Sequence, residues 1–573
     1  MNKLLNITVC AVAALSMTSC VMDSPDVVCP DRGGNRLTIR LAVNEGTRAN
    51  PVPGDDGDGR EYGSTNESAV SDLNIFIYNQ PGGLKSVTSE TVVKKHLYAT
   101  EVNQLMTNTG RYDKVYEVDL DKEEYEVETN DHILLLANYG KKIEGVAEGT
   151  ATVSDLANMI FTSIWTDNAN PYECEKFLMA NAKDDDGMII VDPNDNTRFG
   201  CTVDIERMSS RIDWMFNTGN LPGSGDKEGC LVYPVVNYDG SSSATGSKIY
   251  MEKILPVNTV MPGESDKAED RGVYMLKHLT TGENNSFALE DLVWCQSEGA
   301  QGVVPTRYVA EPRSAKKTDT PLSANLTAWY GASAAATLKA GKNYESAFEH
   351  DAIDVYARYE LDNNLTVKES NYGNFNRYMT LTYCHENTQP SNLHLADYIT
   401  GLAMQCTFRP GKVYSGYNSA TGLEENTSYE TGSTFWRFTP TKQEMKESES
   451  VYFDNETAAK AYSRAFKANE NGLNPDGVPG VIERFDDARC YYNVWLRHAN
   501  TDTFNNGWDS TDPHETFPME FGIVRNNIYR IGVSFTGPGS SNLTLREPWN
   551  VRFRIFVRKW NIREVPEVQI PLR

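Results

Sequence analysis

Short segments in which apolar and polar residues alternate recur along the 573-residue chain, and they restrict its fold more than any other feature. In Arg36–Val43, the residues Leu37, Ile39, Leu41 and Val43 fall on one face of an extended strand. A strand of this kind is stable only when its apolar face is covered by further strands or by a second layer. The pattern therefore predicts an all-β protein with a buried core.

The rest of the chain predicts many strands and a few short helices. Ile133–Leu136 is a continuous apolar run, as expected for a strand covered on both faces. Ser154–Trp165 has helical spacing, with Ser154 as its N-cap. Glu456–Asn469 is also predicted to be a helix, with Asn455 as its N-cap. Further predicted strands are Leu73–Tyr78, Ile133–Ala137, Cys201–Phe216, Cys490–Leu496, Asn527–Phe535 and Trp549–Trp560.

The length predicts two to four domains, at about 100–200 residues each. A turn-rich stretch at 217–222 predicts a boundary between an N-terminal domain, 49–217, and a C-terminal domain, 218–573. The sequence contains no repeat of about 20–50 residues, so a solenoid is not predicted. Many short strands with few helices favour β-sandwiches for both domains.

The first twenty residues have the composition of an export signal. Lys3 gives a short basic region, and Ile7–Leu15 is an apolar stretch of signal-peptide length. Small residues then precede Cys20, which resembles a bacterial lipoprotein signal in which residues 1–19 are removed and Cys20 is lipidated. An ordinary signal peptide with an incidental cysteine is the alternative. After residue 20 there is no apolar run of about 18 residues or more, so no transmembrane helix is predicted.

The net charge of the chain argues against two classes of partner. Lys and Arg number 54, and Asp and Glu number 79, which gives a net charge of −25. Nucleic-acid binding requires a basic face for the phosphates, and docking of the folded body on an anionic membrane requires one as well. An acidic surface is compatible with a secreted, soluble particle.

The cysteines and acidic clusters do not predict a metal site or a cofactor. None of the ten cysteines forms a CxxC motif, and most are expected to be buried thiols, with a disulfide between some pair as the alternative. Cys384, His385 and Glu386 are adjacent, but chance explains this better than a metal site. Asp55–Asp58 and Asp184–Gly187 lack the spacing of a calcium loop and are expected to be solvated turns.

No motif of a catalytic site is present. The sequence lacks GxSxG, HExxH, a P-loop and a GxGxxG segment followed by a helix. A catalytic carboxylate pair cannot be selected among 79 acidic residues without a fold. The sequence therefore offers no case for an enzyme, and no catalytic residue is proposed.

Several segments, taken in order, resemble the fimbrillins of Bacteroides-type fimbriae, the type V pilins, and most of all the shaft subunits of minor fimbriae. Residues 220–450 match this family poorly. The segments that carry the resemblance are Cys20, Leu37–Val43, Arg48-Ala49, Leu73–Tyr78, Leu134–Asn138, Phe177–Ala180, Val203–Arg207, Arg211-Ile212, Cys490–Leu496, Phe521–Tyr529 and the strand that ends at Trp560.

This resemblance implies two transthyretin-like β-sandwich domains and assembly by strand exchange into a fimbrium at the cell surface. It implies that an outer-membrane lipoprotein precursor is cut between Arg48 and Ala49 by an Arg-specific protease. The propeptide, 20–48, would leave with the first strand. A C-terminal strand of a neighbouring copy, or of another fimbrial subunit, would then fill the groove. Gly, Asn and Pro residues around Arg48 favour exposure to a protease.

The C-terminal residues contain the expected donor strand. Val568, Ile570 and Leu572 repeat the spacing of the first strand, and burying three such side chains gives roughly 5–9 kcal/mol. Association costs about 4–15 kcal/mol, so these three residues alone do not suffice. Pro571 also lacks the N–H that a central strand needs. The donor is therefore expected to include the preceding strand, with its apolar residues Val551, Phe553, Ile555 and Val557.

The C-terminal tail has the opposite charge to the rest of the chain. Residues 542–573 contain seven basic and three acidic side chains, a net charge of +4. One hypothesis is that this tail docks on an acidic groove of the next subunit. The alternative is that the basic strand neutralises its own domain.

Two other functions compete with that of a fimbrial subunit. One is a surface lipoprotein that binds glycans or host ligands through exposed aromatic residues and does not polymerise. The other is a secreted hydrolase built on β-sandwiches. A tip subunit needs no donor strand, and an anchor keeps its lipid and first strand. The presence of both Arg48 and an extended C-terminal strand therefore favours a shaft subunit.

Overall fold

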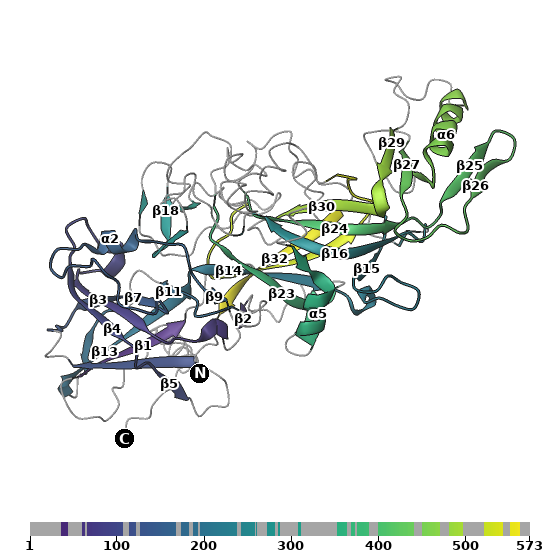
Figure 1. The fold of residues 1–573 in the computed structure, drawn as a ribbon. Coiled ribbons are helices and arrows are strands. Elements are labelled where there is room, and N and C mark those ends of the chain that lie inside the picture. The colour runs from purple at the N-terminus through teal and green to yellow at the C-terminus, as the bar shows by residue number, and fades with distance from the viewer. Residues whose placement is uncertain are drawn as a thin grey trace, which may run out of the picture.

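Strands dominate the computed structural model of the chain, and the helices are few and short (Figure 1). Of the predicted all-β fold with a few short helices, the mostly-β class is confirmed. The structure describes residues 36–43, 60–62, 66–106, 114–121, 126–167, 174–182, 187–192, 195–237, 242–243, 245–257, 259, 272–280, 285–286, 308–310, 352–363, 368–372, 375–388, 399–439, 450–469, 481–496, 521–542 and 551–561.

The N-terminal part is built on one nine-stranded sheet, in the order β4-β3-β7-β11-β13-β1-β6-β5, with β12 on β13. Neighbouring strands are antiparallel except for β1 and β13, which run parallel. The strands are β1 (Arg36–Val43), β3 (Leu73–Asn79), β4 (Val93–Ala99), β5 (Asn103–Met106), β6 (Lys114–Asp121), β7 (Asp131–Ala137), β11 (Met179–Asn181), β12 (Ile190–Asp192) and β13 (Asp195–Arg207).

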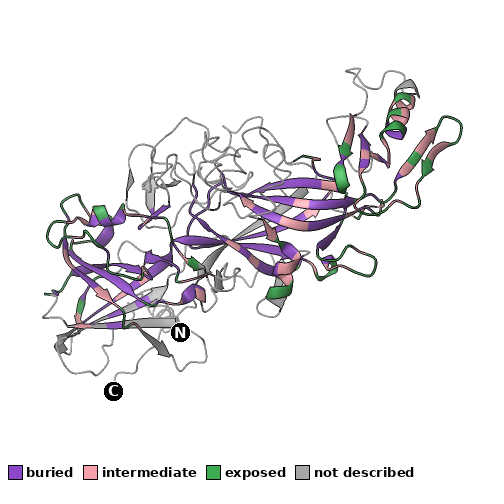
Figure 2. Ribbon diagram, viewed as in Figure 1, coloured by how far each residue is buried: buried purple, intermediate pink, exposed green. Residues whose placement is uncertain are grey.

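All residues of β7 are buried, which confirms the prediction that its apolar run is covered on both faces. Ile133 and Leu135 belong to the core on one side of the sheet, and Leu134 and Leu136 belong to a second core on the other side. Successive side chains of β7 therefore point alternately into the two cores. Figure 2 shows buried residues concentrated along these inner strands.

The predicted helix Ser154–Trp165 is wrong in length and cap. Helix α2 spans only Val153–Ala157, and Thr152 caps it in a capping box with Asp155. The chain then forms β8 (Ile160–Phe161), which pairs with β17 (Val273–Tyr274). Ile160, which has helical spacing, therefore lies in a strand. Local spacing could not predict this, because the partner strand lies more than 100 residues further along the chain.

Two sheets pack over one large core in the C-terminal part. Members of this core come from both sheets, among them Trp214, Ile531, Met404 and Tyr492. The first sheet has the order β2-β32-β31-β14-β23-β22, and the second has the order β15-β16-β24-β30, with β21 on β16. The strands are β2 (Arg60–Tyr62), β14 (Ser209–Phe216), β15 (Leu231–Pro234), β16 (Lys248–Val257), β21 (Ile353–Asp354), β22 (Lys368–Tyr372), β23 (Phe375–His385), β24 (Gly401–Arg409), β30 (Arg489–Trp495), β31 (Asn527–Phe535) and β32 (Val551–Asn561).

The chain passes from the N-terminal sheet to the C-terminal sheet between Arg207 and Ser209, where β13 ends and β14 begins. This lies upstream of the turn-rich stretch at 217–222. Strand β2 already belongs to the C-terminal sheet, although it follows β1 closely in sequence. The two parts are therefore linked by more than one crossing of the chain.

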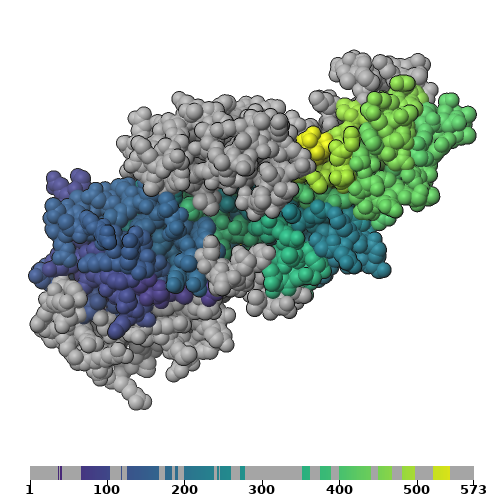
Figure 3. Space-filling view, in the orientation of Figure 1, coloured from purple at the N-terminus to yellow at the C-terminus, as the bar shows by residue number. Residues whose placement is uncertain are grey.

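A third layer lies at the end of the molecule opposite the N-terminal sheet (Figures 1 and 3). Its sheet has the order β26-β25-β28-β27-β29. Helix α6 spans Glu456–Asn469, as predicted, and Asn455 caps it by accepting the backbone N–H of Ala458 at 2.8 Å. The strands are β25 (Tyr414–Asn418), β26 (Gly422–Glu425), β27 (Phe435–Thr439), β28 (Val451–Phe453) and β29 (Val481–Phe485).

The remaining elements are short. None of the helices in the described part of the chain is long and apolar enough to cross a membrane. The remaining elements are the strands β9 (Thr166–Asp167), β10 (Cys174–Glu175), β18 (His278–Thr280), β19 (Asn285–Ser286) and β20 (Tyr308–Ala310), the helix α5 (Val355–Asn363), and the 3-10 helices η1 (Asn66–Ser68), η2 (Gly83–Ser86), η3 (Thr218–Asn220) and η9 (Asp486–Ala488).

Candidate functional site

Strand β1 lies inside the N-terminal sheet, with a neighbour on each edge. Its residues pair in parallel with Arg198–Ile205 of β13 and antiparallel with residues 116–121 of β6. The alternating sequence explains this position, because one face carries the apolar side chains that the core requires. Leu37, Ile39 and Leu41 are each 0% exposed and belong to the N-terminal core.

Loss of β1 would open a slot with two hydrogen-bonding walls and an apolar floor. Val203 of β13 and Val118 of β6 belong to the core that the β1 side chains fill. Burying three side chains of this size contributes roughly 5–9 kcal/mol, and each ladder hydrogen bond adds about 0.5–1.5 kcal/mol. A strand that replaces β1 must therefore supply both the apolar face and the ladder.

The segments that flank the predicted cleavage site belong to different sheets. β1 pairs in the N-terminal sheet, whereas β2 pairs in parallel with residues 559–561 of β32 in the C-terminal sheet. The chain between them contains Arg48 and Ala49, which lie outside the described residues, as does Cys20. A cut in this connection would separate β1 from β2 and would leave every described strand after β1 in its own chain.

The predicted donor residues fall into two groups. Val568, Ile570 and Leu572 lie outside the described residues. Val551, Phe553, Ile555 and Val557 lie in β32, whose nine pairs with β31 run from Val551 to Lys559. Because β32 also has β2 on its other edge, it is an inner strand of its own sheet. These four residues could join a neighbouring subunit only if that ladder were broken.

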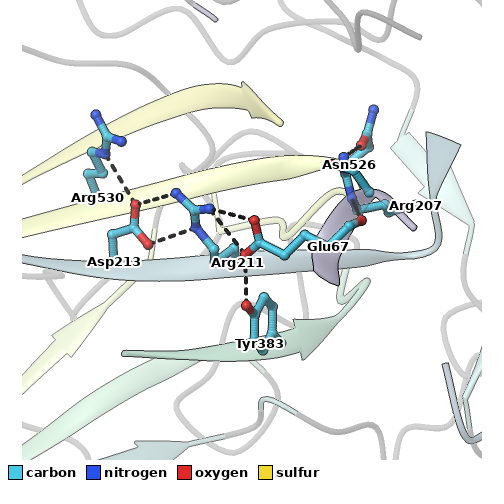
Figure 4. A network of polar contacts seen from close by, with 8 residues as sticks. Glu67, Arg207, Arg211, Asp213, Tyr383, Asn526 and Arg530 are labelled. Atoms are coloured by element: carbon cyan, nitrogen blue, oxygen red, sulfur yellow. Dashed lines mark hydrogen bonds and ion pairs between the residues drawn. The ribbon is translucent and has the colours of Figure 1, made fainter. Parts of the chain in front are cut away.

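A buried network of charged residues joins the two parts of the molecule (Figure 4). Glu67, in η1, accepts hydrogen bonds from Nη1 of Arg211 at 3.1 and 3.2 Å and from the Tyr383 hydroxyl at 2.7 Å. Arg211 also pairs with Asp213 at 2.8 Å, and Arg530 donates to Asp213 at 3.2 Å. Buried charges are retained only where such partners offset their desolvation.

Arg207 extends this network to Asn526, the residue before β31. Its guanidinium donates to the backbone oxygen of Glu67 at 2.7 Å and to Asn526 Oδ1 at 3.2 Å. Burial and the neighbouring Glu67 carboxylate raise the pKa of Tyr383 well above its usual value. This network was not predicted from the sequence. The charged residues at 207, 211 and 213 inside predicted strands were the signal that could have revealed it.

The adjacent residues Cys384, His385 and Glu386 are all buried, and Cys384 belongs to the large core of the C-terminal part. Glu386 pairs with Arg525 at 2.8 Å, and the His385 ring packs edge-on against Trp165. Burial lowers the pKa of His385 to about 4. No cluster of three His, Cys, Asp or Glu side chains suited to a metal occurs in the residues that the structure covers. Asp55–Asp58 and Asp184–Asp186 lie outside them.

The described cysteines agree with the prediction of buried thiols. Cys201, Cys230, Cys384, Cys406 and Cys490 are buried, Cys174 is partly buried, and none of these six forms a disulfide. Burial raises the pKa of Cys490 to about 12. Such thiols are poor nucleophiles at neutral pH.

Residues 483–564, which include β30, β31 and β32, match the family described as major fimbrial subunit protein type IV, Fimbrillin, C-terminal. This segment of the chain therefore has the sequence features of the C-terminal region of fimbrillins. Fimbrillins are structural, non-enzymatic subunits of cell-surface fimbriae.

Solved structures of fimbrial proteins are similar to the chain at low identity. A fimbrilin from Porphyromonas gingivalis W83 is 12% identical and has a TM-score of 0.34, with 93% of this chain and 99% of that chain covered. The tip fimbrial protein Mfa3 from Porphyromonas gingivalis is 10% identical and has a TM-score of 0.28, with 91% and 100% covered. No curated protein matches the chain.

Proposed function

We propose that this chain is a fimbrillin shaft subunit that polymerises by strand exchange at the slot of β1. The observation that carries the proposal is the position of β1, which is an inner strand with three fully buried side chains and precedes the connection that contains Arg48. A strand so placed can be lost only if an equivalent strand replaces it. The two parts of the chain would be the two transthyretin-like sandwiches of the family.

The proposed precursor is an outer-membrane lipoprotein. Residues 1–19 are the signal peptide, Cys20 carries the lipid, and an Arg-specific protease cuts between Arg48 and Ala49. Removal of the propeptide, 20–48, discards the lipid and frees β1 to leave. The separation of β1 and β2 into different sheets supports this scheme, because the cut would leave the pairing of β2 intact.

We assign the donor role first to the tail that follows β32. Val568, Ile570 and Leu572 have the spacing of Leu37, Ile39 and Leu41, so they would fill the same three core positions. The pairing of β32 on both edges argues against its release, and Val551, Phe553, Ile555 and Val557 would then remain in their own domain. The positive net charge of residues 542–573 would favour approach to an acidic neighbour.

The test uses purified precursor treated with an Arg-specific protease. Wild-type protein should form a ladder of multimers. Ile570→Asp should abolish the ladder, because it places a charge in an apolar position of the slot. Gln569→Asp is the matched control, since it adds the same charge outside the apolar stripe, and it should polymerise. Equal polymerisation of both variants would contradict the donor assignment. A wild-type protein that is cleaved after Arg48 but stays monomeric would favour the non-polymerising lipoprotein.

A further inference from the structure

The two walls of the β1 slot are held in different ways. β13 keeps β11 and β12 on its other edge, so it stays part of the sheet without β1. β6 has β5 on its other edge, and β5 ends the sheet. Within the strands described, the β5–β6 hairpin is thus hydrogen-bonded to the rest of the sheet only through β1.

Two apolar side chains of β6 pack in the same core as the side chains of β1. Val118 is buried and Leu120 is partly buried, and both pack with the core that Leu37, Ile39 and Leu41 fill. If β1 leaves, β6 loses its six paired positions, Arg36–Leu41, together with these apolar neighbours. An isolated two-stranded hairpin is at best marginally stable in water.

We propose that the β5–β6 hairpin comes away from the sheet when β1 leaves, and that the incoming strand re-attaches it. This inference rests on the proposed strand exchange and adds a requirement for the partner. The incoming strand must pair along both of its edges, with β13 on one side and β6 on the other. Pairing with β13 alone would leave the hairpin unattached and the slot open on that side.

The rigid wall, β13, then receives the incoming strand first, and the hairpin closes on it afterwards. The slot thus does not need to exist as a fully formed groove before the partner arrives. Ladder hydrogen bonds to β6 form only after the incoming strand has paired with β13. Binding of the incoming strand therefore completes the slot that holds it.

The first experiment uses the full chain without processing, and it measures hydrogen exchange of backbone amides by mass spectrometry. Ile39→Asp places a charge in the core under β1, whereas Ile39→Val keeps the position apolar. We expect Ile39→Asp to speed exchange in 114–121 by about tenfold or more, with a much smaller change in β3 and β7. We expect Ile39→Val to change the exchange rate of 114–121 little. Equal changes in 114–121, β3 and β7 would overturn the inference.

The second experiment follows processing itself. Precursor that lacks residues 562–573 is cleaved, loss of the β1 peptide is followed by mass, and a synthetic peptide of residues 562–573 is then added. Protection of 114–121 should fall when β1 is lost and return with the peptide. Faster exchange of 114–121 that the peptide does not reverse would support the hairpin and contradict the donor assignment. Peptide binding with 114–121 protected throughout would overturn the hairpin inference and leave strand exchange intact.

Discussion

A single carboxylate, that of Glu67, links residues that are far apart in sequence. It lies in a three-residue 3-10 helix soon after β2, yet it accepts hydrogen bonds from Arg211 and from Tyr383. All three side chains are buried. Because Arg211 and Tyr383 belong to adjacent strands of the C-terminal sheet, Glu67 holds the segment after β2 against that sheet.

Glu67→Ala should therefore destabilise the protein. Removing one partner of a buried ion pair costs about 3–5 kcal/mol, and we expect about 3 kcal/mol, since Arg211 keeps Asp213 as a partner. The free energy of unfolding in urea measures this loss. Glu90→Ala is the matched control, because Glu90 is exposed and its loss should change stability by no more than about 0.5 kcal/mol. Equal stability of the two variants would contradict the structural role of Glu67.

Among the elements, local pattern predicted some well and others poorly. Helix α6 was predicted in full, because its cap and its apolar spacing lie within the helix itself. β7 was predicted from its continuous apolar run, since a strand covered on both faces buries every side chain. The segment after α2 was mispredicted, because β8 exists only through its pairing with β17. The neighbours of β1 likewise could not be predicted, since β6 and β13 lie far along the chain.

The segment that begins at Gly272 is held by both parts of the molecule. The amides of Met275 and Leu276 donate to the backbone oxygens of Met159 and Ala157, in the N-terminal part. From the C-terminal part, Arg525 donates to the backbone oxygen of Met275 at 2.9 Å. The segment after Gly272 is therefore a buried contact between the two parts.

Gly272→Ala should loosen this contact. Gly272 has a φ of 94°, and a Cβ there would lie 2.1 Å from the backbone oxygen of Phe161. Gly229→Ala is the control, because Gly229 has a φ of 71° with no atom near the added Cβ. We expect Gly272→Ala to cost about 1–3 kcal/mol more than the control, and exchange of the Met275 and Leu276 amides to speed up. The opposite ranking of the two variants would be incompatible with close docking at Phe161.

At the scale of the whole molecule, the sequence predicted the mostly-β class and the family, but not how the parts are joined. The chain crosses to the C-terminal sheet first at β2, returns to the N-terminal sheet at β3, and crosses again at Met208. The segment after Gly272 then returns to the N-terminal part, where β17 pairs with β8. Buried charged residues lie near these crossings, and their partners are distant in sequence: Arg207 donates to Asn526, and Arg525 pairs with Glu386. Alternation identifies a strand and its buried face, whereas it carries no information on which sheet the strand joins.

The central claim is that the tail of one copy occupies the β1 slot of the next. A photoreactive amino acid at position 570 tests it directly, in fibres assembled from a mixture of isotope-labelled and unlabelled subunits. We expect mixed-isotope cross-links from position 570 to 114–121 of β6 or to 198–207 of β13. Cross-links confined to a single chain, or mixed-isotope cross-links only to other regions, would contradict it.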